Sequence, residues 1–187
     1  SPFFAYWPGK LQPGLASDKI AMHIDIAPTL MEICGVNKPD DLKQDGRSIW
    51  PLLSRQAADW PERTLFSQSH RGDAPMLYHN FAARNQKWKL VSATGFGLAA
   101  LPTGGPKFEL FDIQNDPYEQ RDVASEHPDI VAKLKGEYEA WFKDVGSTRS
   151  DNYAPPRIIV GSPHEKTTVL TRQDWRGAAW GPNDEGH

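Results

Sequence analysis

The segment 128–145 constrains the fold of this chain most, because its apolar residues recur with the period of an α-helix. Pro128 suits the first helical position, where its missing N–H is not needed, and Gly146 is suited to end the helix. The apolar positions are Ile130, Val131, Leu134, Tyr138, Trp141, Phe142 and Val145. They form one stripe, so we expect a long helix that packs this stripe on other elements. The alternative interpretation is that this apolar stripe forms a groove that binds a partner.

Stretches with strand-like composition precede this helix. We predict strands at 64–67, 80–84, 87–92 and 108–113, with a hairpin turn between the second and the third. The connection at 94–106 is rich in Gly and Pro. Short strands followed by one long helix predict an α+β fold, in which a small antiparallel sheet of about four strands packs on a long C-terminal helix.

The beginning of the chain has a different pattern. Residues 2–7 are apolar and precede a Pro-Gly turn, which predicts a buried strand. Asp25 is placed to cap a helix over 26–34, and Gly35 is suited to the position after its last turn. A domain rarely begins with an aromatic strand unless another strand lies beside it. We therefore expect Ser1 to mark a cut inside a larger domain.

A short apolar helix at 49–53 and a linker at 54–62 complete this first part. We therefore divide the chain into three regions. Residues 1–57 end a core domain, residues 58–146 form the sheet-plus-helix subdomain, and residues 147–187 form an extended tail or linker.

Composition excludes several classes of function. The net charge is −3, from 21 Lys and Arg against 24 Asp and Glu, which does not favour binding to nucleic acid or to an anionic membrane surface. No apolar run approaches the roughly 20 residues that span a bilayer. Cys34 is the single cysteine, so an intrachain disulfide is excluded.

Several short motifs occur in an order that is more specific than any one of them. They are Trp7-Pro8-Gly9-Lys10, His23-Ile24-Asp25 with Pro28-Thr29-Leu30, Asp45-Gly46-Arg47-Ser48 before Pro51-Leu52-Leu53, Trp88-Lys89-Leu90-Val91, and Glu109-Leu110-Phe111-Asp112 with Asn115-Asp116-Pro117-Tyr118-Glu119. Across residues 2–145 this arrangement resembles the C-terminal third of the sulfatase family, within the alkaline-phosphatase-like superfamily.

The resemblance implies a particular parent enzyme. Sulfatases have a large α/β catalytic domain that holds calcium and a formylglycine made from a Cys/Ser-x-Pro-x-Arg motif. Their smaller C-terminal subdomain pairs a four-stranded antiparallel sheet with a helix. The resemblance therefore implies that the first region is a strand-helix remnant of the α/β core. It also implies that the N-terminal catalytic domain is this chain's partner and that a sulfated glycan is a possible ligand.

The reacting groups of that family do not match residues of this chain. Cys34 is followed by Gly-Val-Asn and not by x-Pro-x-Arg, and Asp40-Asp41 match no ligand position of the family. No catalytic and no metal residue is therefore transferred. We expect a C-terminal sulfatase fragment that shapes the substrate pocket and is inactive alone. The alternatives are a fragment of a phosphonate or phosphodiester hydrolase of the same superfamily, and a non-catalytic module that binds a glycan or a partner.

The stretch 69–75 is the most site-like part of the chain, because it follows a predicted strand and contains His70 and Arg71. These side chains are suited to bind a sulfate or an anionic sugar, so we predict them as substrate-binding residues. The alternative is a surface loop held by salt bridges. His23 and Asp25 have the spacing of a metal pair, but we favour a capping Asp25 and a packed His23. The role of His79 is left open.

Overall fold

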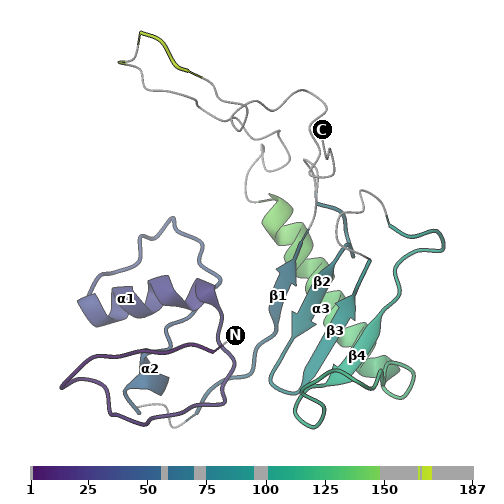
Figure 1. Cartoon of the computed structure of the whole chain (residues 1–187), viewed down its shortest axis with the longest axis horizontal. Helices are drawn as coiled ribbons and strands as arrows, with labels where there is room; N and C mark the ends of the chain where they lie inside the picture. The colour runs from purple at the N-terminus through teal and green to yellow at the C-terminus, as the bar shows by residue number, and fades with distance from the viewer. Residues whose placement is uncertain are drawn as a thin grey trace. The chain divides into compact units, whose positions relative to one another are not determined.

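The computed structural model describes residues 2–55, 59–69, 75–94, 101–147, 164 and 166–169. By its contacts the chain divides into two compact units, 1–65 and 66–187, and each is described by itself (Figure 1). Within the described parts of the chain, no helix has the length and apolar character required to cross a membrane.

The second unit is built on a four-stranded sheet. Its strands are β1 (Leu65–Gln68), β2 (Phe81–Arg84), β3 (Trp88–Ser92) and β4 (Glu109–Asp112), in that spatial order. β3 runs antiparallel to both neighbours, with Ala83 opposite Leu90 and Leu90 opposite Leu110. The predicted strands are confirmed, with ends that differ by one residue.

The helix α3 (Pro128–Ser147) covers one face of this sheet, as Figure 1 shows. The predicted stripe provides the contact, because Leu134 and Tyr138 are fully buried in the core. The strands contribute alternate residues to the same core, namely Phe81, Ala83, Leu90 and Leu110. Val145 differs from the prediction, since 38% of it is exposed in the last turns of the helix. The α+β architecture is therefore confirmed.

Polar groups of this unit fix the helix to the sheet. The ring of Tyr138 stacks on Phe81 with centroids 3.8 Å apart. Its hydroxyl accepts a hydrogen bond from the backbone N–H of Tyr78 at 3.2 Å and donates one to Gln68 Oε1 at 3.1 Å. A buried tyrosine usually finds such partners, because an unpaired hydroxyl would lose its hydration without compensation.

The first unit contains α1 (Ile26–Cys34), which coincides with the predicted helix. A short 3-10 helix, η1 (His23–Asp25), precedes it. Gly35 has the left-handed conformation (φ 65°), which glycine adopts without a steric cost, so this prediction is also confirmed. The predicted short helix is α2 (Trp50–Leu53).

The prediction of a buried strand at 2–7 is wrong for this structure. These residues have no strand conformation and are exposed, Phe4 and Tyr6 almost completely. A strand requires a hydrogen-bonded neighbour, and none of the four described strands pairs with this segment. Apolar composition alone therefore did not determine the conformation of residues 2–7.

Candidate functional site

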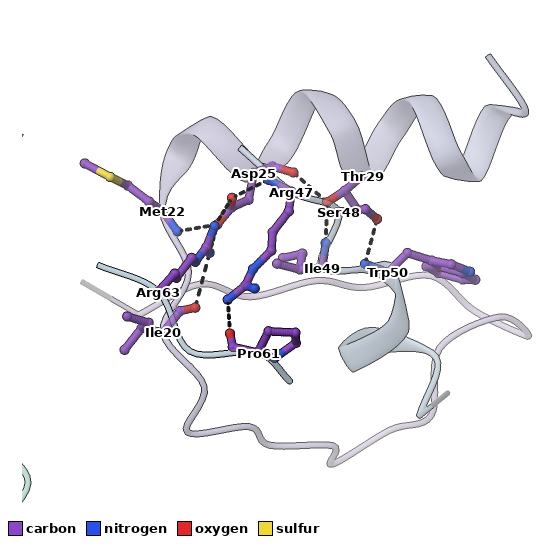
Figure 2. Close-up of polar contacts among 10 residues, drawn as sticks. All are labelled: Ile20, Met22, Asp25, Thr29, Arg47, Ser48, Ile49, Trp50, Pro61 and Arg63. Atoms are coloured by element: carbon purple, nitrogen blue, oxygen red, sulfur yellow. Dashed lines mark hydrogen bonds and ion pairs between the residues drawn. The ribbon is translucent and has the colours of Figure 1, made fainter. Parts of the chain in front are cut away.

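The most elaborate polar site in the described residues surrounds Asp25, whose side chain is fully buried (Figure 2). Its two carboxylate oxygens accept hydrogen bonds from four donors. Oδ1 accepts from the backbone N–H of Arg47 at 3.0 Å and from Arg63 Nη1 at 2.7 Å. Oδ2 accepts from the backbone N–H of Met22 at 2.8 Å and from Arg63 Nη2. The carboxylate is therefore saturated by this chain's own donors.

Arg63 is the charge partner of Asp25. Both of its Nη atoms bind the carboxylate, in the bidentate geometry that suits a planar guanidinium. Nη2 also donates to the carbonyl of Ile20 at 3.3 Å. The side chain of Arg63 is only 12% exposed, so the pair is largely removed from water. Removal of either partner would leave a buried charge without compensation.

The environment of Asp25 favours its ionised form. Burial by itself would raise the pKa of Asp25, because a charge loses its hydration. The hydrogen bonds from Arg63 and from the backbone N–H groups of Met22 and Arg47, together with the positive charge of Arg63, outweigh this effect. They hold the pKa of Asp25 below its ordinary value. A carboxylate in this state is a structural anion and not a proton donor at neutral pH.

The motif Asp45-Gly46-Arg47-Ser48 packs directly against the start of α1. A Cβ on Gly46 would lie 1.9 Å from the carbonyl oxygen of Ile24, so only glycine fits at this position. The hydroxyl of Thr29 extends the contact. It donates to the carbonyl of Asp25 at 2.6 Å and accepts from the backbone N–H of Ile49 at 2.9 Å. The backbone at 46–49 is thus fixed to the first turn of the helix.

The side chain of Arg47 contacts a third segment of the chain. Its Nη2 donates to the carbonyl of Pro61 at 2.6 Å, and its guanidinium carbon lies 4.2 Å from the ring centroid of Trp60. Burial and the nearby charge of Arg63 lower the pKa of Arg47, and the charge of Asp25 acts in the opposite direction. Figure 2 shows that the two arginines approach from different segments and connect 20–25, 46–49 and 60–63.

These contacts correct two sequence predictions. Asp25 does occupy the N-cap position of α1, but its side chain makes no capping bond there. It instead accepts a hydrogen bond from the backbone N–H of Met22, the N-cap residue of η1. His23 was expected to be packed, yet it is exposed and does not join Asp25. Neither prediction included Arg63, which lies 38 residues away, just after the predicted linker.

No metal site appears among the residues that the structure describes, since they include no group of three His, Cys, Asp or Glu side chains arranged to hold an ion. Both oxygens of Asp25 are already occupied by hydrogen bonds, and Cys34 is followed by Gly-Val-Asn and not by x-Pro-x-Arg. These residues therefore do not fit calcium or a formylglycine precursor.

A second unusual place is the turn before β2. Tyr78 (φ 66°) and Asn80 (φ 43°) are both left-handed although neither is glycine, and buried His79 lies between them. Asn80 exchanges two hydrogen bonds of 3.1 Å with Thr94, which compensates its conformation. His79 Nδ1 lies 3.4 Å from the carbonyl of Ser69, and Nε2 has no partner in the described structure. The predicted residues His70 and Arg71 lie outside the described residues.

Comparison with known proteins gives the chain a context. A family model described as N-sulphoglucosamine sulphohydrolase, C-terminal, matches residues 1–143. An ulvan-active sulfatase of Formosa agariphila is 27% identical over 181 residues, which cover 85% of this chain and 36% of the relative. An N-acetylglucosamine-6-O-sulfatase of Bacteroides thetaiotaomicron is 24% identical over 178 residues, which cover 94% of this chain and 28% of the relative. The chain thus spans only about a third of these proteins.

Solved structures agree with the fold. The structure of BT4656 in complex with its substrate D-glucosamine-2-N,6-O-disulfate has a TM-score of 0.55 and 22% identity, covering 78% of this chain and 28% of that chain. The structure of Ps i-CgsB in complex with k-i-k-neocarrahexaose has a TM-score of 0.56 and 20% identity, covering 79% of this chain and 34% of that chain. At these identities the likeness concerns the fold.

Proposed function

The chain belongs to the family described as N-sulphoglucosamine sulphohydrolase, C-terminal, and we propose that the longer protein containing it hydrolyses a sulfate ester. The match over residues 1–143 is the observation that carries this proposal, because it extends through the first unit and over the second as far as residue 143. The curated relatives compared above have sulfatase names, which supports the same reaction.

We propose a sulfated glycan as the substrate class. One relative is named for activity on ulvan and another for a 6-O-sulfate of N-acetylglucosamine. One structural neighbour was solved with a disulfated glucosamine. The last two names describe amino sugars sulfated at different sets of positions, so the proposal is limited to the class.

Within that enzyme, this chain would shape the substrate pocket and not perform the chemistry. The described residues do not fit calcium or a formylglycine precursor, so we assign both groups to an N-terminal catalytic domain. We propose that residues 1–57 complete that domain, that residues 58–146 form the C-terminal subdomain, and that residues 147–187 form a tail. The saturated Asp25 site supports a scaffolding role, because it joins three segments without leaving a reactive group.

We further propose that His70 and Arg71 contact the anionic substrate. The support is their chemistry and their place in the sequence, between β1 and β2. An arginine offers paired donors to sulfate oxygens, and loops on a rigid sheet commonly carry binding residues. A surface loop held by salt bridges remains the competing explanation.

Sulfate release from sulfated mono- and oligosaccharides tests these proposals. We expect activity from the intact protein and none from residues 1–187 alone. In the intact protein, Arg71→Ala and His70→Ala should raise KM with a smaller effect on kcat. Arg84→Ala is the matched control, because Arg84 is an exposed arginine on β2 of the same unit. Equal kinetics for Arg71→Ala and Arg84→Ala would reject the binding role.

A further inference from the structure

The turn that precedes β2 is held in a conformation that its residues disfavour. Tyr78 and Asn80 are both left-handed, and a bulky aromatic residue with a φ of 66° is an outlier among residues other than glycine. Such conformations persist only where the surrounding contacts impose them, and they cluster at functional sites. The contacts that impose this conformation therefore indicate what the turn does.

Contacts from α3 and from the end of β3 fix the turn. The backbone N–H of Tyr78 donates to the hydroxyl of Tyr138, and the hydroxyl of Tyr78 donates to Glu139 on the same helix. Thr94 follows β3, and it accepts from the backbone N–H of Asn80 and donates to the side chain of Asn80. The turn is thus attached to the elements that form the core of the second unit.

The fixed turn holds Ser69, the residue that directly follows β1. The backbone N–H of Ser69 donates to the carbonyl of Asn80 at 3.1 Å. The carbonyl oxygen of Ser69 lies 3.4 Å from His79 Nδ1. A carbonyl oxygen only accepts, so Nδ1 donates in this contact. Both backbone groups of Ser69 are therefore bound to the turn.

The same turn also fixes the chain at Met76, which follows the stretch 69–75. The carbonyl of Met76 accepts from the backbone N–H of His79 at 3.1 Å and from Gln68 Nε2 at 2.7 Å. The chain is therefore held on both sides of 70–75 by residues 79 and 80 and by the last residue of β1.

Packing alone does not explain a histidine at position 79. The residue is 2% exposed, and Nε2 has no hydrogen-bond partner among the described residues. A buried polar atom without a partner costs free energy that an apolar side chain of similar size would avoid. The contact between Nδ1 and Ser69 is the feature that an apolar side chain could not provide.

We propose that His79 is a positioning residue for the substrate-binding stretch that begins after Ser69. The carbonyl of Ser69 and the N–H of His70 belong to one planar peptide group, so a bond to this carbonyl orients the chain where it enters the stretch. This inference rests on the proposed binding of an anionic substrate by His70 and Arg71. A stretch that is oriented in advance loses less freedom on binding, so His79 acts on KM more than on kcat.

Two substitutions in the intact protein separate this role from packing. His79→Asn keeps a donor three bonds from Cα, as Nδ1 is, whereas the amide nitrogen of His79→Gln lies four bonds away, as Nε2 does. His79→Gln should raise KM for a sulfated oligosaccharide about threefold to tenfold, the range for loss of one hydrogen bond, with a smaller change in kcat. His79→Asn should stay within about twofold of wild type. A packing role gives the reverse order, because the smaller Asn leaves the larger cavity.

Hydrogen exchange of the Ser69 amide provides a readout that is independent of sulfate release. This N–H bonds to Asn80, next to His79, so its exchange should be about threefold to tenfold faster in His79→Gln and unchanged in His79→Asn. Mass spectrometry with fragmentation to single residues measures it. His127→Gln is the matched control, because the ring of His127 lies 4.9 Å from that of Trp88 at the start of β3, at the other end of the sheet from this turn.

Equal exchange of the Ser69 amide in His79→Gln and His127→Gln would overturn the proposal. A larger rise in KM for His79→Asn than for His79→Gln would also reject it, in favour of packing. If His79→Gln does not fold, Thr94→Val replaces it, because it removes the acceptor for the Asn80 N–H and should accelerate the same exchange. Unchanged exchange in that variant would count against the proposal. If no saccharide is hydrolysed, the proposed reaction fails, and the exchange rates still decide whether His79 holds Ser69.

Discussion

Arg63 binds both carboxylate oxygens of Asp25, 38 residues earlier in the chain, and Asp25 has no exposed surface. The same carboxylate accepts from the backbone at Met22 and Arg47. One side chain thus connects the start of α1, the loop before α2 and the segment that leads to β1. The stability of the first unit should therefore depend strongly on this ion pair.

Arg63→Gln should lower the free energy of unfolding by about 3–5 kcal/mol, because it leaves the buried Asp25 charge without its partner. Chemical denaturation followed by tryptophan fluorescence measures the change. Arg121→Gln is the control, since Arg121 pairs with Glu126 on the surface and should contribute about 1 kcal/mol or less. A smaller loss for Arg63→Gln than for Arg121→Gln would contradict the role given to Asp25.

The lowered pKa of Asp25 makes the stability depend on pH. In the unfolded chain Asp25 titrates near its ordinary value of 3.8, and in the folded chain it titrates below that value. The stabilisation is present above the unfolded value and is lost as the pH falls through the lower, folded value. The melting temperature should therefore decrease as the pH is lowered below about 4. Asp112 acts in the same direction, so the measurement is the difference between wild type and Asp25→Asn. Parallel pH profiles for the two proteins would disprove this assignment.

Replacing either of two glycines with alanine should change the stability of the chain, in opposite directions at the two positions. Gly46→Ala would place a Cβ against the carbonyl of Ile24, so we expect a loss of about 2 kcal/mol or more from overpacking. Gly136 lies inside α3 with open space around its Cβ position, so Gly136→Ala should stabilise the chain by about 0.5–1 kcal/mol. Thermal unfolding of the two variants provides the comparison. A neutral Gly46→Ala would show that the backbone at Ile24 can move.

Tyr138→Phe should destabilise the second unit by about 1–2 kcal/mol, although the ring and its stacking on Phe81 are retained. The substitution removes the acceptor for the backbone N–H of Tyr78 and the donor to Gln68. Tyr118→Phe is the matched control on an exposed tyrosine and should be neutral. Urea unfolding measures both variants. Equal midpoints would show that water replaces the lost hydroxyl.

Sequence periodicity predicted α1, α3 and the four strands, because these depend on spacings within one segment. The apolar stripe from Ile130 to Phe142 packs on the sheet, whose strands contribute alternate apolar residues to the same core. The left-handed Gly35 was likewise predictable, since few other residues adopt that conformation readily.

The sequence by itself thus determined the elements and the fold class, since propensity and apolar periodicity act over a few residues. Only the tertiary structure decided that the carboxylate of Asp25 turns away from α1, that Arg63 joins it, and that Leu30 faces outward. These outcomes depend on contacts between segments far apart in the chain, and a buried charge adopts the position in which all its donors meet. Residues 2–7 illustrate the same limit, because a strand is stable only beside a neighbour that local sequence does not specify.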